Sequence, residues 1–195
     1  MFPVSKYKKL HRGPQVITLK DAAFISAFCG VQSGDKVVDA GSGSGWLAVY
    51  LGNLVSPKGK VYSYEIRGEF AEIARKNIEK TGLEKVVEVK EKNVFDRIDE
   101  KNVDLVTLDL ANAEKALPNA FDALKEKGFT VGYLPNVEQV KTFVLTGEKL
   151  GFKHVQTLEV NARQLLVREH GCRPQTKGIT HTAFLSFLKK PSSKE

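Results

Sequence analysis

Cysteine is scarce in this chain of 195 residues, which holds Cys29 and Cys172 and no Cys-x-x-Cys pair. Disulfide frameworks and cysteine-rich metal sites use more cysteines at closer spacing, so we expect two reduced thiols and no metal. Long hydrophobic runs are also missing, because no stretch reaches the roughly 18 apolar residues of a membrane-spanning helix. The first ten residues, MFPVSKYKKL, contain no apolar signal-peptide segment. Together these absences predict a cytoplasmic protein.

Repeats and low-complexity segments are absent as well, and PSSKE at the end of the sequence is typical of a frayed tail. What is present is an ordinary globular composition, 42% hydrophobic and 27% charged. A length of 195 residues suits one domain with a substantial core. We expect a lead-in and helix in residues 1–30, the core in 31–190 and a tail in 191–195.

The formal charge of +7 is concentrated at the two ends of the chain. Residues 1–20 carry five Lys or Arg and no acid, and residues 161–195 carry seven Lys or Arg and two Glu. Each end therefore has a charge of +5, and the 140 residues between them sum to −3. A polyanionic partner held by both ends would explain this distribution. A solvated basic surface is the alternative.

From Lys36 onward, short β-branched runs alternate with longer amphipathic stretches. Alternation of this kind predicts a parallel sheet covered by helices on both faces. Only residues 170–179 connect the last two strands, and this connection is too short for a parallel crossover that contains a helix. We therefore expect these two strands to pair antiparallel. The expected strands are 36–41, 60–66, 86–92, 103–110, 129–134, 154–169 and 180–190, and the expected helices are 20–29, 44–54, 68–81, 112–127 and 136–150.

Glycine and asparagine mark the expected helix boundaries. Gly82, Gly128 and Gly151 each follow a helical stretch, where glycine commonly ends a helix. Asn136 precedes the helix that Gly151 ends, and asparagine is a favoured N-cap. These residues predict where three of the helices begin or end.

The stretch DAGSGSGWL, from Asp39 to Leu47, places Gly41, Gly43 and Gly45 at the end of the first expected strand. Ligands of open α/β sheets bind beyond the carboxyl ends of the strands, and glycine lets a ligand approach the backbone there. A dinucleotide fingerprint is G-x-G-x-x-G, but the register here is G-x-G-x-G followed by a tryptophan. That indole would crowd a pyrophosphate at the helix N-terminus, so the pattern argues against NAD.

Two carboxylates stand at the tips of later strands. Glu65 lies twenty residues after Gly45, where a carboxylate accepts both hydroxyls of a ribose. Asp109 ends the fourth strand between Leu108 and Leu110, and we expect this tip to face the same crevice. The alternatives are a surface glutamate and an aspartate that caps a turn.

This order of features resembles the class I S-adenosylmethionine-dependent methyltransferases. The resemblance implies an α/β, Rossmann-like sheet of seven strands, mostly parallel with an antiparallel last strand and with helices on both faces. Four stretches are similar to the tRNA adenine-N1 methyltransferase family, and the resemblance extends over nearly the whole chain. They are HRGPQVITLKDAAFI (11–25), LDL (108–110), GYLPNVEQV (132–140) and RPQTKGITHTAFLSF (173–187).

The resemblance implies methyl transfer from S-adenosylmethionine to N1 of an adenine in tRNA, performed by the core of the chain. Asp109 matches the catalytic residue that accepts a hydrogen bond from the exocyclic amine of the target adenine. His181 is one of the candidate RNA-binding residues, and a hydrogen bond within the core is the alternative role for its side chain. The candidate cofactor-binding residues are Ile17, Gly41, Ser42, Gly43, Ser44, Gly45, Trp46, Glu65, Asn93, Val94 and Asp109. The candidate RNA-binding residues are Arg12, Lys20, Arg163, Arg168, Arg173 and His181.

Three departures from the family pattern leave alternatives open. The shared lead-in begins near His11, so we expect the family's N-terminal β-rich domain, which helps to bind tRNA, to be missing. Either a partner subunit supplies that contact to tRNA or the substrate differs. Asn93 stands where the family usually offers an acid to the cofactor adenine. Residues 110–114 replace a Pro-x-Pro-Trp-like stretch.

These departures keep two other functions open. One is methylation of another substrate, such as a corrin-ring precursor, and the other is a non-catalytic RNA-binding subunit of a methyltransferase complex. The family resemblance also implies a homo-oligomer, commonly a tetramer.

Overall fold

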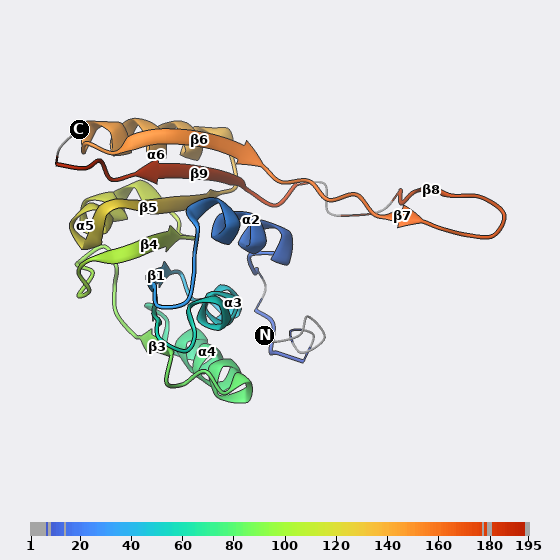
Figure 1. Ribbon diagram of the computed structural model, residues 1–195, viewed down its shortest axis with the longest axis horizontal. Helices are drawn as coiled ribbons and strands as arrows, with labels where there is room; N and C mark the ends of the chain where they lie inside the picture. Colours follow the sequence, from blue (N-terminus) through green and yellow to red (C-terminus); the bar gives the residue numbers. More distant parts are fainter. Residues whose placement is uncertain (1–6, 8, 14, 177, 179–180, 194–195) are drawn as a thin grey trace.

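The computed structural model describes residues 7, 9–13, 15–176, 178 and 181–193. Its centre is a seven-stranded sheet in the order β3-β2-β1-β4-β5-β9-β6 (Figure 1). The pairs from β3 through to β5 are parallel, and β9 is antiparallel to both of its neighbours. The prediction of a mostly parallel sheet with an antiparallel last strand is confirmed. The strands are β1 (Lys36–Ala40), β2 (Lys60–Tyr64), β3 (Val87–Lys90), β4 (Val103–Leu108), β5 (Leu124–Leu134), β6 (Lys153–Glu159) and β9 (Phe184–Lys189).

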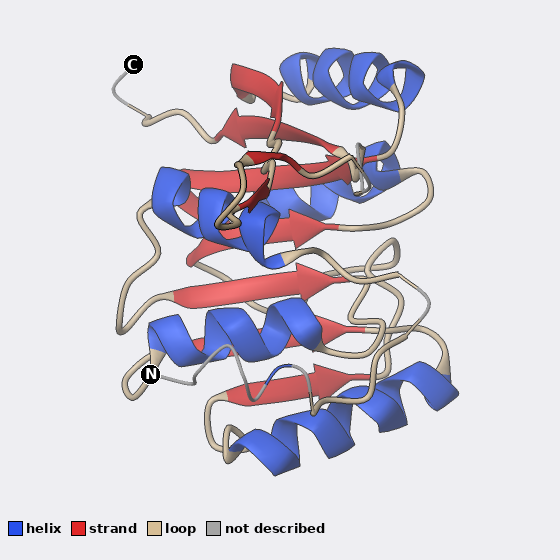
Figure 2. Ribbon diagram, turned by 90° about the vertical axis from the view of Figure 1, so that its right-hand side faces the viewer, coloured by secondary structure: helices blue, strands red, loops and turns tan. Residues whose placement is uncertain are grey.

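Helices cover both faces of the sheet, and a hydrophobic core lies on each face (Figure 2). Because side chains alternate across a strand, Val37 of β1 belongs to one core and its neighbour Val38 to the other. Ile25 and Leu51 from α2 and α3 fill the first core, and Phe143 from α6 fills the second. The helices are α2 (Leu19–Cys29), α3 (Trp46–Val55), α4 (Gly68–Thr81), the 3₁₀ turn η1 (Ala113–Ala116), α5 (Leu117–Ala123) and α6 (Val137–Lys149).

Local capping signals place two helix boundaries where the sequence predicts them. Gly82 follows α4 in the left-handed region, at φ +69°, and its N–H donates to the carbonyl of Glu79. The side chain of Asn136 accepts a hydrogen bond at 2.9 Å from the backbone N–H of Gln139 and so caps α6. Both predictions are confirmed, because a cap depends on neighbours along the chain alone.

The helix expected over residues 112–127 ends early, and this prediction is wrong. Helix α5 stops at Ala123, and β5 begins with Leu124, which pairs with Val103 of β4. Lys127, at φ +64°, donates its N–H to the carbonyl of Lys190 at 2.9 Å. Pairing within the sheet therefore overrides the helical pattern. Gly128 lies inside β5 and does not end a helix.

The strand expected over residues 154–169 is too long. Strand β6 ends at Glu159, which pairs with Phe184, the first residue of β9. Among the described residues, neither strand has a partner in the sheet beyond this pair, and residues 160–176 leave the sheet as an extended segment, here called the arm (Figure 1). Within the arm, β7 (Leu165–Leu166) pairs antiparallel with β8 (Arg173–Pro174). The strand expected over 180–190 is correspondingly shorter, and residue 180 lies outside the described residues.

Three further features bear on function. Within the described part of the chain, no helix is long and apolar enough to cross a membrane. The described residues also include no group of three His, Cys, Asp or Glu side chains placed to hold a metal ion. Burial raises the pKa of the Cys29 thiol to about 12, so this side chain is a neutral thiol and not a nucleophilic thiolate.

Candidate functional site

The carboxyl ends of β1, β2 and β4 open into a cavity of about 400 Å³, which we call the turn cavity. Its wall combines the glycine turn after β1, the residues that follow β2 and β4, and the segment before α2. This is the edge of an open α/β sheet at which ligands bind. The polar residues of the wall include Gln15, Asp39, Ser42, Ser44, Glu65, Arg67 and Asp109, and the apolar ones include Val16, Ile17, Trp46, Ile66, Phe70 and Phe95.

The glycine turn depends on close backbone approach at two of its glycines. A Cβ on Gly41, at φ +94°, would lie 2.2 Å from the carbonyl oxygen of Asp109. A Cβ on Gly45, at φ +76°, would lie 3.1 Å from the Cβ of Ala74 in α4. A side chain at either position would push apart the elements that form the cavity wall.

Glu65 is buried directly after β2, and its carboxylate holds the glycine turn in place. Its Oε2 accepts a hydrogen bond from the N–H of Gly43 at 2.9 Å. Its Oε1 accepts from both the backbone N–H and the Nε of Arg67, each at 3.1 Å. A carboxylate offers about four acceptor sites, so one site on Oε2 is left for a ligand in the turn cavity.

A buried polar network supports the turn from below. The carboxylate of Asp39 accepts hydrogen bonds from Ser63 Oγ at 2.8 Å and from Thr107 Oγ1 at 3.0 Å, and the hydroxyls of Ser63 and Ser42 lie 2.5 Å apart. Burial raises the pKa of Asp39, and these two hydrogen bonds oppose the rise. The network therefore ties β1, β2 and β4 together at the end where the cavity opens.

Asp109 follows β4 and separates two cavities. Its backbone N–H donates to the carbonyl of Ala40 at 2.9 Å, which fixes it beside the tip of β1. Burial, and then the negative charge of Asp39, raise the pKa of Asp109 to about 7. Asp109 lines the turn cavity and also a second cavity of about 250 Å³, which we call the Asp109 cavity. The second wall includes Arg12, Gln15, Val16, Thr18, Asp109, Tyr133, Pro135, Thr182 and Ala183.

A second buried carboxylate, that of Asp21, organises the far side of the Asp109 cavity. Its Oδ2 accepts hydrogen bonds from the hydroxyls of Thr18 at 2.8 Å, Thr182 at 3.0 Å and Tyr133 at 3.3 Å. Its Oδ1 accepts from Lys20 Nζ at 2.7 Å. From α2, Asp21 therefore joins Thr18, β5 and the segment before β9, three parts of the chain that line this cavity.

The structure brings most of the expected cofactor-binding residues to one cavity, although their roles remain predictions. Gly45 packs beneath the turn against α4, and Val94 is buried in the core on the α5 side. Asn93 is not among the residues that line the turn cavity, and its Oδ1 accepts a hydrogen bond from the N–H of Phe95 at 3.0 Å within its own loop. The residues that line the turn cavity as expected are Ile17, Gly41, Ser42, Gly43, Ser44, Trp46, Glu65 and Asp109.

Sequence reasoning missed several apolar residues of the turn cavity, among them Ile66 and Phe95. Ile66 and Phe95 are 65% and 38% exposed, although large hydrophobic side chains are usually buried. Both follow strand tips, directly after Glu65 and two residues after Asn93. A large apolar residue within two positions after a strand-tip acid or amide is the signal that could have identified them.

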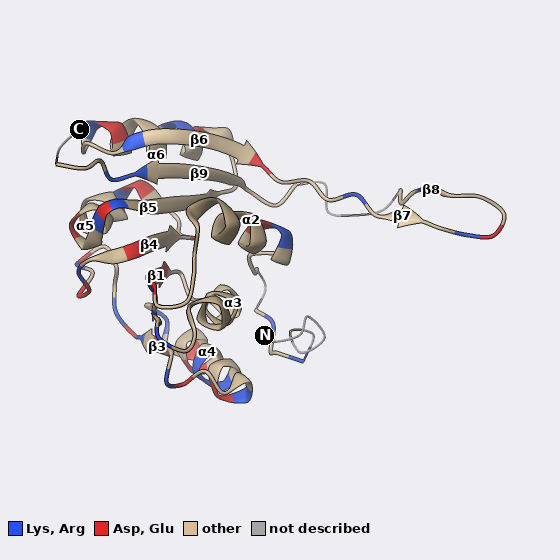
Figure 3. Ribbon diagram, viewed as in Figure 1, with Lys and Arg blue, Asp and Glu red and all other residues tan. Residues whose placement is uncertain are grey.

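Of the expected RNA-binding residues, two lie beside the cavities and three lie on the arm. The guanidinium of Arg12 lies over the ring of Trp46, 5.8 Å from its centroid. Lys20 Nζ is already bonded to Asp21 and donates to Thr182 Oγ1 at 2.8 Å. The arm residues Arg163, Arg168 and Arg173 are exposed, and basic residues recur along the arm (Figure 3).

His181 is bonded within the protein at an exposed position. Its Nδ1 lies 2.6 Å from Glu159 Oε1, and its Nε2 lies 2.9 Å from the carbonyl oxygen of Pro135. These two partners, Glu159 first, raise the pKa of His181. Because both ring nitrogens face acceptor oxygens, the geometry favours the imidazolium, which ties the end of β6 to the loop after β5.

Known proteins of one family are similar to most of this chain. The family model described as "tRNA methyltransferase complex GCD14 subunit" matches residues 7–183. The curated relative tRNA (adenine(57)-N(1)/adenine(58)-N(1))-methyltransferase TrmI from Methanocaldococcus jannaschii is 36% identical over 210 residues, covering 94% of this chain and 74% of that protein.

Solved structures share the fold. A SAM-dependent O-methyltransferase from Thermotoga maritima superposes with a TM-score of 0.88 at 31% identity, covering 93% of this chain and 68% of that one. A precorrin-6y C5,15-methyltransferase from Geobacter metallireducens gives a TM-score of 0.76 at 17% identity, covering 94% and 95% of the two chains. At that identity the likeness to the precorrin enzyme is one of fold alone.

Proposed function

The chain belongs to the family of the tRNA methyltransferase complex GCD14 subunit, and we propose that it is an enzyme that transfers a methyl group from S-adenosylmethionine to N1 of an adenine in tRNA. One observation carries this function: Asp109 lies in the wall between the turn cavity and the Asp109 cavity. A methyl donor in the first cavity and an adenine in the second meet beside this carboxylate.

The turn cavity fits S-adenosylmethionine on three counts. The free acceptor site on Glu65 Oε2 suits one ribose hydroxyl, and Oε1 becomes available for a second if the Arg67 side chain, 57% exposed, turns away. Ile66 and Phe95 offer apolar surface for an adenine ring. Ser44 Oγ is a buried atom without a hydrogen-bond partner among the described residues, and its residue lines the cavity, so it suits a polar group of the methionine part.

The main task of the protein in this reaction is to position the target adenine against the methyl group. Bound S-adenosylmethionine supplies an electrophilic methyl group. Adenine N1 attacks with an in-plane lone pair that carries no proton, so no protein base is needed, and the task is to align the ring. Asp109, as a carboxylate, accepts a hydrogen bond from the exocyclic amine. This contact orients the base and stabilises the positive charge that the ring gains with the methyl group.

The substrate must bring an unstacked adenine to the Asp109 cavity, which costs a few kcal/mol for a base in folded RNA. Basic side chains near the cavities and along the arm favour an RNA backbone. Arg12, Lys20, Arg163, Arg168 and Arg173 are therefore proposed contacts to tRNA, whereas His181 acts through its partners within the protein. A tRNA substrate also leads us to propose a cytoplasmic location.

The arm also supports a proposal about assembly. Leu165 and Val167 are 64% and 79% exposed on the arm, so it has apolar side chains to bury against another chain. We propose a homo-oligomer, of the tetrameric kind that the family resemblance implies, with the arm at a subunit contact. The alternative to a homo-oligomer is a complex with a different subunit that contributes further contacts to tRNA. Sedimentation velocity on the purified chain distinguishes one copy from several.

The decisive experiment is methyl transfer from labelled S-adenosylmethionine to unmodified tRNA, followed by identification of the product nucleoside. We expect N1-methyladenosine. Asp109→Ala should lose most of kcat and retain donor binding measured by calorimetry, while Asp122→Ala, an exposed aspartate on α5, should behave as the wild type. Failure to bind S-adenosylmethionine at millimolar concentration would contradict the proposal that the chain is a methyltransferase. Full activity of Asp109→Ala would remove its catalytic role.

A further inference from the structure

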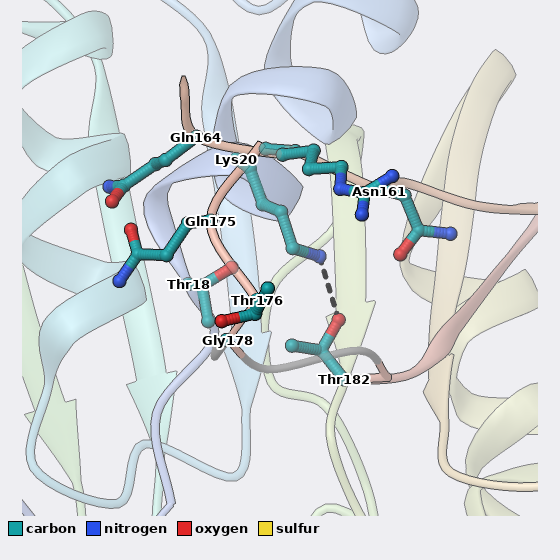
Figure 4. A pocket seen from close by; sticks show the side chains of 10 residues that line it. Thr18, Lys20, Asn161, Gln164, Gln175, Thr176, Gly178 and Thr182 are labelled. Atoms are coloured by element: carbon teal, nitrogen blue, oxygen red, sulfur yellow. Dashed lines mark hydrogen bonds between the residues drawn. The ribbon is translucent and has the colours of Figure 1, made fainter. Parts of the chain in front are cut away.

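We propose that a third cavity, between α2 and the arm, binds an unpaired nucleotide adjacent to the target adenine, and this proposal rests on the proposed function. The cavity has a volume of about 580 Å³ and is here called the arm cavity (Figure 4). That volume is within the range of sites that hold a small ligand. Thr18, Lys20 and Thr182 line it from the body of the protein, and Asn161, Gln164 and Gln175 line it from the arm.

The three cavities form a continuous series. The turn cavity and the Asp109 cavity share Gln15, Val16 and Asp109. The Asp109 cavity and the arm cavity share Thr18 and Thr182. An adenine beside Asp109 therefore has the methyl donor on one side and the arm cavity on the other. The next nucleotide of the same single strand is the chemical group that the RNA itself brings to that place.

Two amides of the arm form one wall of the cavity. The N–H of Gln175 donates to the carbonyl of Gln164 at 2.8 Å, which extends the β7–β8 pairing by one residue pair. Opposite residues of an antiparallel pair project from the same face, and Figure 4 shows the two amides close together. Within the described residues, neither side chain makes a hydrogen bond, so both amides have free donors and acceptors. Sequence-specific RNA recognition uses such groups on the edges of unstacked bases.

Cationic side chains complete the site. Lys20 Nζ points toward Thr182 (Figure 4) and uses two of its three protons, on Asp21 and Thr182, which leaves one for a ligand. Asp21 balances the charge of Lys20, so the net positive charge of the cavity comes from Arg163, which has no ion pair among the described residues. Amides that read a base and a cation that holds a phosphate fit a nucleotide better than an apolar peptide.

The test compares the wild type with Gln164→Ala/Gln175→Ala on unmodified tRNA transcripts. In one set of transcripts the nucleotide before the methylated adenine is replaced by each of the other three bases. In a second set the nucleotide after it is replaced in the same way. One bidentate base contact discriminates by 1–3 kcal/mol, so we expect the wild type to prefer one base at one flanking position by about tenfold or more in kcat/KM. The double variant should lose that preference and keep its affinity for S-adenosylmethionine. Gln32→Ala, an exposed glutamine in the loop before β1, is the matched control.

A second variant tests the phosphate contact independently. Arg163→Ala should raise KM for every transcript and lower the salt dependence of tRNA binding by about one phosphate contact. An unchanged flanking preference in the double variant, or none in the wild type, would overturn the subsite while the wild type still methylates tRNA. No methyl transfer by the wild type to any transcript would instead count against the proposed function. A changed sedimentation coefficient of the double variant, without a flanking preference in the wild type, would mean that another copy of the chain fills the cavity.

Discussion

The Oε2 atom of Glu65 accepts a hydrogen bond from the backbone N–H of Gly43, at 2.9 Å and across 22 residues of sequence. Glu65, at the tip of β2, therefore holds the glycine turn that follows β1. It does so in addition to contacting any ligand in the turn cavity. Because the side chain of Glu65 is buried, this carboxylate serves the shape of the turn cavity as well as its chemistry.

Glu65→Gln should weaken binding of S-adenosylmethionine by about tenfold or more. The substitution removes one carboxylate oxygen and places an amide donor against the N–H groups of Gly43 or Arg67. Hydrogen bonds to charged groups contribute about 1.5–3 kcal/mol, which corresponds to this loss of affinity. Calorimetric titration measures it, with Glu69→Gln on the exposed side of α4 as the control. Unchanged affinity in Glu65→Gln would show that the carboxylate neither shapes the turn nor binds the ligand.

Trp46 should report ligand binding by fluorescence, because it is the single tryptophan of the chain and lines the turn cavity. Its Nε1 donates to the carbonyl of His11 at 3.2 Å, and its ring meets that of Tyr7 edge to face. We expect the emission to shift in intensity or wavelength as S-adenosylhomocysteine saturates the site. Trp46→Phe supplies the blank. Emission that stays constant at saturation, as judged by calorimetry, would place the ligand away from this ring.

Much of the fold could be predicted because its signals lie close together in sequence. Gly82 ends α4 and Asn136 begins α6 through contacts with near neighbours, and the apolar run before Gly41 marks β1 by its own residue pattern. The end of α5 could not be predicted in this way, because Leu124 joins β5 by pairing with Val103 across the sheet. Tertiary pairing of that kind leaves no local pattern.

In the candidate site, too, residues marked by local motifs could be predicted, and residues placed by tertiary contacts could not. Motif spacing led to Glu65 and Asp109, which both line the turn cavity. It did not lead to Phe95, since Asn93 was expected at the third strand tip and instead holds the N–H of Phe95. Nor did it suggest the role of Asp21, whose partners Tyr133 and Thr182 are more than a hundred residues away.

Asp21→Asn should lower both stability and turnover. An amide in place of the carboxylate loses one acceptor oxygen and leaves Lys20 without its ion pair, which costs about 2–3 kcal/mol for a buried group. Thr182 and Tyr133 then lose their common partner beside the Asp109 cavity. We expect a lower melting temperature, a lower kcat on tRNA and an unchanged affinity for S-adenosylmethionine. A variant that melts early but keeps full kcat below its melting temperature would make Asp21 a structural residue alone.

Asp109 should make activity and stability respond to pH in opposite directions. Its pKa is raised to about 7 by burial and by Asp39. The carboxylate is the form that accepts a hydrogen bond from the adenine amine, so kcat/KM should rise as the pH increases through about 7. Measurement of kcat/KM between pH 5.5 and about 8.5 checks this, with donor affinity followed in parallel. A rate that is flat across this range would show that Asp109 is already ionised at its lower end.

The stability follows from the same ionisation. A carboxyl group whose pKa is higher in the folded than in the unfolded chain stabilises the fold fully below its unfolded value of 3.8, and that contribution is lost as the pH rises through about 7. At about 1.4 kcal/mol per pKa unit, the loss is of the order of 4 kcal/mol. Asp109→Asn has no such group, so its melting temperature should exceed that of the wild type by more at pH 8 than at about pH 5. Asp122→Asn, a change at an exposed residue of α5, should show no pH-dependent difference. If Asp109→Asn and the wild type instead keep a constant difference from pH 5 to about pH 8, the charge on Asp109 is not held in a buried environment.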